Sequence, residues 1–257
     1  MPTFSHPNID IYTLYQLLQQ RHFGVEYQPI IDLHTNTIMG WEALARFYTT
    51  DNTPIRPDWV FEALHADELC LFNIEYQMKK LQLAHAPKEG LLFLNIDPHA
   101  FAVFGDHQSN PLLALLVDKH DVVIEIIENT DANDARHSSA MSHAFKKQGL
   151  LMALDDVGDS NSMLSFEVLL HMDYLKLDRS WLTHRHKATH RYLLEALCSF
   201  AHRSGKKLIL EGVENEQDLR FARKLGVNYV QGFLYRPQFR QYSPTSTSKS
   251  ELTAAIT

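Results

Sequence analysis

Eight short apolar runs recur along the chain, and segments of helical period separate most of them. Alternation of this kind is typical of strand and helix units that build a parallel sheet. Eight strands in a chain of 257 residues predict an α/β fold of the (β/α)8 barrel type. In order, the runs are VEYQPII, IMGWEALA, LLFLNI, DVVIEII, LLMALDD, YLKLD, KLILEGV and NYVQGF.

One connection breaks this pattern. Only the six residues DLHTNT separate the first two runs, whereas a parallel crossover needs a dozen or more. We therefore expect the first two strands to run antiparallel. Helical segments fit between later runs: residues 57–86 could hold two helices, and residues 190–203 place apolar side chains on one stripe.

The chain is expected to have three parts. Residues 1–22 would form an amphipathic helical extension packed on the barrel, residues 23–240 the barrel itself, and residues 241–257, rich in Ser and Thr, a disordered tail. The net charge of −7 argues against binding to duplex nucleic acid. The sequence has neither a signal peptide nor a run of about 18 apolar residues, which predicts a cytoplasmic protein without a membrane span.

Polar side chains, most of them acidic, stand at or near the ends of all eight runs. In barrels of this type the strand ends build the active face. Carboxylates from several strands repel one another unless cations bind among them, and oxygen ligands favour Mg²⁺ or Mn²⁺ over zinc. For any single acid, capping of the following helix is the simpler interpretation. The set is Gln28, Glu42, Asn95, Glu125, Glu128, Asp155, Asp156, Lys176, Asp178, Glu211, Glu214 and Gln231.

The adjacent acids Asp155 and Asp156 follow an apolar run. Neighbouring strand residues face opposite sides, so both can serve one site only if the strand ends there, and Gly158 would let the chain turn. Each acid could then hold one ion of a pair that clamps the oxygens of a phosphoryl transfer. Lys176, which shares a strand face with Asp178, could hold an attacking water or offset phosphate charge.

The motifs YQPI, WEALAR, LNID, EIIE, LDDVG, LKLD, EGVE and VQGF resemble, in order and approximate spacing, those of EAL-domain proteins. These are phosphodiesterases of the second messenger cyclic diguanylate (cyclic di-GMP). The resemblance covers about residues 23–240. It implies a modified (β/α)8 barrel with an antiparallel first strand, and hydrolysis of one phosphodiester bond to give linear pGpG.

The resemblance also implies a role for each matching residue. Two divalent ions, Mg²⁺ or Mn²⁺, would be bound, and the chain would contact cyclic di-GMP directly. The first ion would be held by Glu42, Asn95, Glu125 and Asp155, with Asp156 helping to hold the second. Catalysis would involve Lys176, Glu211 and Glu42, supported by Glu128, Asp178, Glu214 and Gln231. The dinucleotide would be contacted by Gln28, Leu44, Arg46 and Pro237, although GFLYRP is one residue shorter here than in the family.

The loop after the paired aspartates departs from the family. Active members usually read DDFGTGYSSL, whereas this chain reads DDVGDSNSML, and Ile127 stands where a threonine is usual. This loop, residues 157–163, carries the second ion and, in many relatives, part of a homodimer contact. The changed loop positions are Val157, Asp159, Ser160, Asn161 and Met163.

Three functions are compatible with these residues. The first is an active, metal-dependent cyclic di-GMP phosphodiesterase. The second is a silent domain of the same fold that serves as a cyclic di-GMP receptor or a protein-interaction module. The third is a metal-free barrel glycosidase with two carboxylates.

Overall fold

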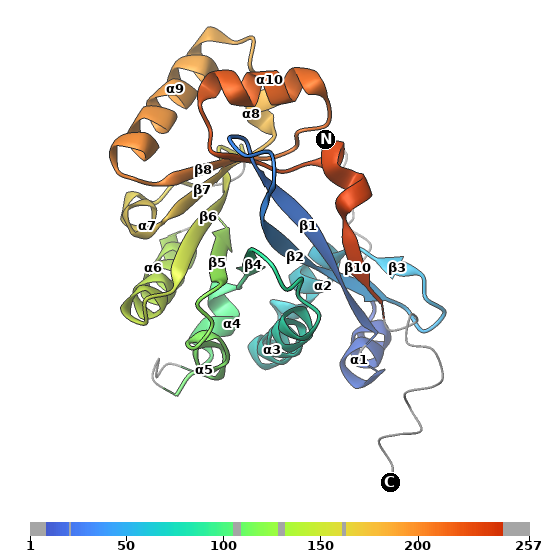
Figure 1. Cartoon of the computed structure of the whole chain (residues 1–257). Coiled ribbons are helices and arrows are strands. Elements are labelled where there is room, and N and C mark those ends of the chain that lie inside the picture. The colour runs from blue at the N-terminus through green and yellow to red at the C-terminus, as the bar shows by residue number, and fades with distance from the viewer. Residues whose placement is uncertain (1–8, 21, 105–108, 128–131, 161–162, 244–257) are drawn as a thin grey trace, which may run out of the picture.

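The computed structural model describes residues 9–20, 22–104, 109–127, 132–160 and 163–243. Eight of its strands form a closed barrel with helices around the outside, which confirms the predicted fold class (Figure 1). Around the barrel the strands follow the order β1, β9, β8, β7, β6, β5, β4, β2, and β2 pairs with β1 again. Their bounds are β1 (Phe23–Asp32), β2 (Ile38–Tyr48), β4 (Leu91–Asn95), β5 (Val122–Ile127), β6 (Leu151–Val157), β7 (Tyr174–Leu177), β8 (Lys207–Leu210) and β9 (Tyr229–Val230).

The first strand runs against its neighbours, as the short first connection predicted. Strand β1 is antiparallel to both of its barrel neighbours, β2 and β9. All other neighbouring strands of the barrel run parallel to each other. A tight turn replaces a crossover helix here: the Asp32 carboxylate accepts from the backbone N–H of His34, and Asn36 has a φ of 58°. Asn tolerates this left-handed backbone better than most residues do.

The helices cover the outside of the barrel in sequence order (Figure 1). Residues 57–86 contain two of them, as expected, and the Asp67 carboxylate caps the second by accepting from Leu69 and Cys70 N–H groups. The bounds are α1 (Ile11–Gln20), α2 (Pro57–Leu64), α3 (Glu68–Ala84), α4 (Pro98–Ala102), α5 (Pro111–Leu116), α6 (Ala132–Lys147), α7 (Phe166–His171), α8 (Ser180–Thr183), α9 (Ala188–Arg203), α10 (Glu216–Leu225) and the 3-10 helix η1 (Phe233–Gln238).

Two short strands were not predicted. Strand β3 (Pro54–Ile55) pairs with β2, and β10 (Arg240–Tyr242) pairs with β1. Gln241 and Tyr242, assigned by the sequence to a disordered tail, therefore belong to a strand, and residues 244–257 lie outside the described residues. At the other end of the chain, helix α1 buries Leu17 in the core while Ile11 and Tyr12 remain exposed.

Part of β1 and β2 extends past the barrel as a ribbon. Strand β4 pairs with β2 only over Gly40–Glu42, and β9 pairs with β1 only at Ile31 and Asp32. Residues 23–28 and 43–48 therefore pair with each other and with the flanking β10 and β3, but with no other barrel strand. We call this part the β1–β2 ribbon.

The barrel interior is apolar in one layer. Six buried side chains from different strands form a core separate from the larger one between barrel and helices. On the five parallel strands among them, the residue two positions further along the chain also points into the barrel, because strand side chains alternate between two faces. The six are Ile30, Phe93, Val123, Ala153, Tyr174 and Ile209.

The chain turns sharply where β6 ends. Between Leu154 and Val157 β6 advances three residues while β7 advances two, so β6 contains a bulge. Asp156 within it has a φ of 54°, and Gly158 has a φ of 99°. The Trp181 indole then donates to the Val157 carbonyl over 2.7 Å and packs on Gly158, where a Cβ would lie 2.3 Å from the indole nitrogen.

No helix within the described part of the chain is long and apolar enough to span a membrane.

We expect Gly158→Ala to lower the free energy of unfolding by about 2–4 kcal/mol, because the new methyl group would collide with Trp181 on a left-handed backbone. Gly149→Ala is the matched control, since Gly149 has a φ of 77° but no atom within 4 Å of the place that a Cβ would take. That variant should lose only about 1 kcal/mol. Urea unfolding measures both, and equal losses would show that the Trp181 contact is unimportant.

Candidate active site

The site lies directly beyond the apolar layer of the barrel. Asn95, Glu125, Asp155, Lys176 and Glu211 each stand two residues after a member of that layer, so they face the same interior space. Glu42 on β2 pairs opposite Gln28 on antiparallel β1, which brings both to the same end of the barrel. The closed fold therefore converts a two-residue spacing in the sequence into a ring of polar side chains.

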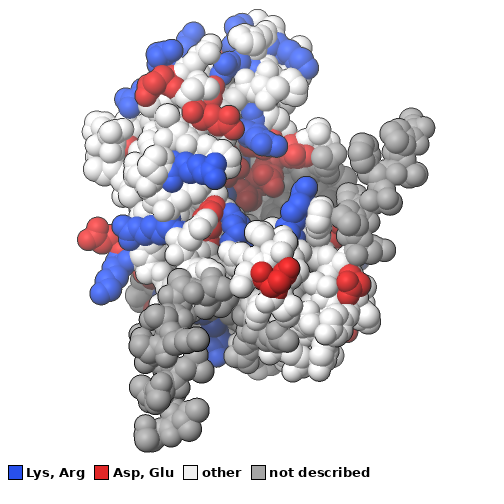
Figure 2. All heavy atoms as spheres, turned by 90° about the vertical axis from the view of Figure 1, so that its right-hand side faces the viewer, with Lys and Arg blue, Asp and Glu red and all other residues white. Residues whose placement is uncertain are grey.

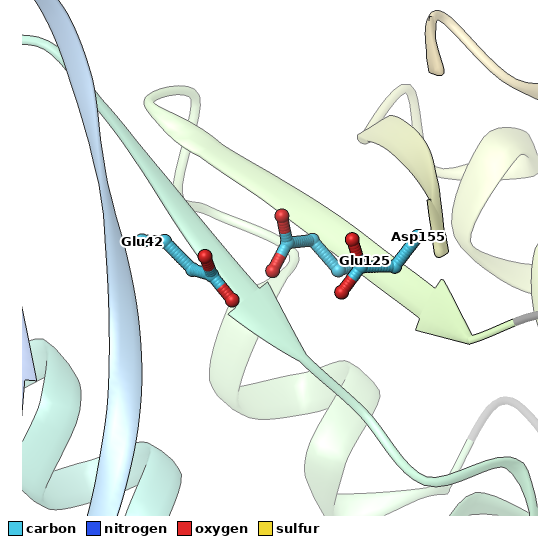
Figure 3. A group of neighbouring side chains, drawn as sticks. All are labelled: Glu42, Glu125 and Asp155. Carbon is cyan, nitrogen blue, oxygen red and sulfur yellow. The ribbon is translucent and has the colours of Figure 1, made fainter. Parts of the chain in front are cut away.

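The Lys176 ammonium occupies the centre of this ring. Lys176 is completely buried, and its Nζ lies 2.8 Å from Glu125 Oε1, 2.8 Å from Asp155 Oδ1, 2.9 Å from Glu211 Oε1 and 3.3 Å from Glu42 Oε2. Figure 3 shows the carboxyl groups of Glu42, Glu125 and Asp155 directed toward a common space from three strands. One positive charge thus holds four carboxylates together.

Two amide side chains complete the ring around Glu42. Asn95 Nδ2 donates to Glu42 Oε1 over 3.2 Å and to Glu125 Oε2 over 3.0 Å. Gln231 Nε2 donates to Glu42 Oε2 over 2.5 Å and reaches Gln28 Oε1 at 3.5 Å. Glu42 is therefore held from both sides and is the best hydrogen-bonded acid of the group.

The acids of the ring differ in the direction in which their pKa is shifted: it is raised for Glu125, Asp155 and Glu211 and lowered for Glu42. Burial and the nearby Glu42 raise the pKa of Glu125 well above its usual range, and burial likewise raises the pKa of Glu211 and Asp155. For Glu42, burial is outweighed by Lys176 and Gln231, which hold its pKa below the usual range. Burial disfavours charge on Lys176 too, but Asp155 and Glu125 outweigh it and raise the lysine pKa well above normal.

The bulge in β6 brings Asp156 into the site beside Asp155. Oxygens of Asp155, Asp156 and Glu211 lie within 4.8 Å of one another, as do those of Glu42, Glu125 and Asp155. Burial, followed by repulsion from Asp155, raises the pKa of Asp156 to about 7. Asp155 belongs to both groups, so it could help to hold a cation at either one.

The donor set fits divalent cations. Glu125 Oε1 and Asp155 Oδ1 are buried without a hydrogen bond of good geometry, although the Lys176 ammonium lies 2.8 Å from each. The excess of buried carboxylates over the single ammonium leaves negative charge to be balanced, and oxygen ligands suit Mg²⁺ or Mn²⁺. Asn95 could join such a site only by turning its amide, because its NH₂ group now faces Glu42 and Glu125.

Other predicted residues lie at the margin of the ring or away from it. Asp178 Oδ1 accepts from Ser180 N–H over 2.7 Å at the start of α8, and its charge contributes to the raised pKa of Asp156. Glu214 and Pro237 are exposed, the latter in η1. Glu128 and Asn161 lie outside the described residues.

A cavity of about 550 Å³ opens beside the ring. Its lining includes Glu42, Asn95 and Asp155 of the ring and Leu44 and Arg46 of the β1–β2 ribbon. Figure 2 shows acidic side chains gathered in a hollow of one face of the molecule, with basic side chains at its edges.

The ribbon also holds a residue that the sequence analysis missed. Glu26 Oε1 accepts from Arg46 over 2.6 Å and from Gln28 over 3.0 Å. The signal was present, because Glu26 stands two residues before Gln28 in one strand and so shares its face.

Comparison with known proteins places these observations in context. The model of the EAL domain family matches residues 12–238. The bifunctional diguanylate cyclase/cyclic di-GMP phosphodiesterase MucR of Pseudomonas aeruginosa is 26% identical over 253 residues, which cover 87% of this chain and 34% of MucR. The probable cyclic di-GMP phosphodiesterase PdeB of Escherichia coli is 27% identical over 233 residues, 86% of this chain and 44% of PdeB. The chain thus spans less than half the length of these relatives.

Solved structures agree with the fold. The P. aeruginosa MucR phosphodiesterase in complex with c-di-GMP superposes with a TM-score of 0.69 at 25% identity, covering 91% of this chain and 98% of that one. The FimX EAL domain from the same organism, bound to c-di-GMP, gives a TM-score of 0.70 at 22% identity and covers 87% and 93%. The second likeness concerns the fold alone.

Loss of the central charge should destabilise the protein. We expect Lys176→Met to lower the free energy of unfolding in chelator by about 3–5 kcal/mol, because four carboxylates, three of them buried, would lose their counter-charge. Lys146→Met is the control: Lys146 pairs with Asp173 at 2.9 Å but is one-third exposed, so its loss should cost about 1 kcal/mol or less. Denaturant unfolding at pH 7 compares them, and a Lys176 variant as stable as wild type would contradict this account.

Proposed function

This chain belongs to the EAL domain family, and from that premise we propose that it is a metal-dependent phosphodiesterase that hydrolyses cyclic di-GMP to linear pGpG. The observation that supports this most strongly is the ring itself. Six of the side chains to which the family resemblance assigns a metal-binding or catalytic role meet at one end of the barrel. They are Glu42, Asn95, Glu125, Asp155, Lys176 and Glu211.

We assign two cation sites, for Mg²⁺ or Mn²⁺, to the two carboxylate groups. Glu42, Asn95, Glu125 and Asp155 would hold one ion, and Asp155 and Asp156 the other, with Glu211 beside them. Bound there, divalent cations would polarise phosphoryl oxygens and lower the pKa of water.

Lys176 and Glu211 would act on charge and protons around the reacting phosphate. The charged Lys176 ammonium, completely buried among the carboxylates, would stabilise negative charge that develops on phosphoryl oxygens. Glu211 Oε1 is held by Lys176, which leaves Oε2 to accept a proton from the attacking water. The raised pKa of Glu211 suits it to this role, because a stronger base takes the proton more readily.

The dinucleotide would lie in the cavity beside the ring. Leu44 offers an apolar contact and Arg46 a planar donor group for phosphate oxygens.

We extend the proposal to a cytoplasmic site of action and to a homodimer, which the altered loop would help to form. Exposed Met163 on that loop is compatible with such a contact.

A second candidate is a receptor or interaction module without turnover. The observation in its favour is the loop: Asp159 adds an acid directly after the turn and donates its backbone N–H to the carbonyl of Asp156 over 2.9 Å. An added negative charge beside Asp156 would change cation binding at the second site. A metal-free glycosidase is disfavoured, because one buried ammonium shared by four carboxylates differs from the two isolated carboxylates which that chemistry uses.

We expect purified protein to convert cyclic di-GMP to pGpG in the presence of Mg²⁺ or Mn²⁺, with chelator abolishing the reaction. Glu42→Ala should lower the rate on the order of 10³-fold, because it removes a cation ligand that Gln231 and Asn95 hold in place. Separation of product by chromatography measures this.

Glu195→Ala is the control for that experiment, since Glu195 is exposed on α9 and should be dispensable. Cyclic di-GMP binding without any pGpG would instead support the receptor. Turnover that persists in chelator would refute the assigned cation sites.

Restoring the family's loop chemistry should raise activity. We expect Asp159→Thr combined with Ser160→Gly to raise kcat by about three- to tenfold, because it removes an acid next to Asp156 and frees the backbone. Ser160→Ala is the control that changes size without adding backbone freedom. Initial rates at saturating Mn²⁺ compare them, and an unchanged kcat in the double variant would place the slow step outside this loop.

A further inference from the structure

Glu26 lies in the middle of the β1–β2 ribbon, on the face that leads to the active site. Strand alternation puts Glu26 and Gln28 on one face of β1, and pairing sets them opposite Leu44 and Glu42 of β2. Arg46, one further step along the same face of β2, is the diagonal neighbour of Glu26. Glu26 therefore adjoins all three ribbon residues expected to contact the dinucleotide.

Both carboxylate oxygens of Glu26 are engaged. Oε1 accepts from Arg46 over 2.6 Å and from Gln28 over 3.0 Å, while Oε2 accepts from Gln241 of β10. The Glu26 and Arg46 side chains are only 12% and 28% exposed, so solvent screens this pair less than a surface pair. The hydrogen bond from Gln28 and the charge of Arg46 together overcome the effect of burial and hold the Glu26 pKa below its usual range.

The contacts of Arg46 leave part of its guanidinium for a ligand. NH1 donates to the Ala45 carbonyl over 2.8 Å, and NH2 to Glu26. Arg46 lines the cavity beside the ring, whereas Glu26 is not among the described residues that line it. Any effect of Glu26 on a ligand in that cavity must therefore pass through the residues it holds.

We propose that Glu26 is a positioning residue for nucleotide binding, which orients Arg46 toward the cavity, holds Gln28 beside it and is itself fixed by Gln241. The proposal rests on the proposed function, because it takes cyclic di-GMP as the ligand. A guanidinium binds phosphate best as a planar fork in a defined orientation, and a side chain already ordered loses less entropy on binding. Glu26 supplies that order without touching the ligand.

The test is the affinity for cyclic di-GMP in a double-mutant cycle. Glu26→Ala should raise Kd and KM about tenfold with kcat changed less than about twofold, because Arg46 contributes to binding in ground state and transition state alike. Glu26→Gln keeps an acceptor oxygen for Arg46 and should recover affinity to within about threefold of wild type. In an Arg46→Ala background, Glu26→Ala should cost less than about twofold.

Controls separate this inference from the proposed function. Glu195→Ala, which removes a carboxylate 3.8 Å from Arg191 on α9, should leave Kd unchanged. If the wild type binds cyclic di-GMP and Glu26→Ala binds it equally well, the inference alone is overturned. The same holds if Glu26→Ala raises Kd in the Arg46→Ala background as much as it does in the wild type. Absence of cyclic di-GMP binding in the folded wild type would overturn the proposed function together with it. Thermal unfolding of each variant checks that the fold is intact.

Discussion

The buried Lys176 ammonium is the interaction on which the site depends. Four carboxylates from different parts of the barrel lie within 3.3 Å of its nitrogen. Without this positive charge the carboxylates would repel one another. The barrel imposes this arrangement, because residues two positions beyond the interior apolar layer have no direction to face except inward. The lysine side chain balances part of the negative charge of the carboxylates, and bound cations would balance the remainder.

Much of this could be predicted from the sequence, since it follows from local periods. The strands, the antiparallel first pair and the inward faces of Glu125, Asp155 and Lys176 are all consequences of two-residue alternation and connection length. Strand β10 could not be predicted, because three residues with no apolar period pair with β1 only once the barrel exists. Glu214 was grouped with the site because it follows a predicted strand, and Pro237 by family resemblance alone; both side chains are exposed.

The turn after β6 shows how tertiary contacts override a local expectation. The sequence placed the turn at Gly158, but the backbone already departs at Asp156, whose φ of 54° is unusual for a residue other than glycine. Pairing of Val157 with Leu177 and the Trp181 hydrogen bond fix the chain on the far side of the bulge. Backbone contacts of Val157, whose side chain is the first altered one of the loop, therefore set the position of Asp156, so the changes at Asp159 and Ser160 need not displace the acid.

The β1–β2 ribbon and the carboxylate ring are held by different strand pairings. The carboxylate ring is locked by the register of a closed barrel, where a shift in one strand would disturb all the others. Among the described strands outside the ribbon, the part that carries Arg46 and Leu44 pairs only with β3 and β10, so side chains on its cavity face can change while the barrel keeps its register. Its opposite face is anchored in the hydrophobic core by Val25, Tyr27 and Phe47. Under the proposed function, the side chains that contact the ligand and those that cleave it therefore stand in different strand pairings, and substitutions in one set can accumulate while the other is preserved.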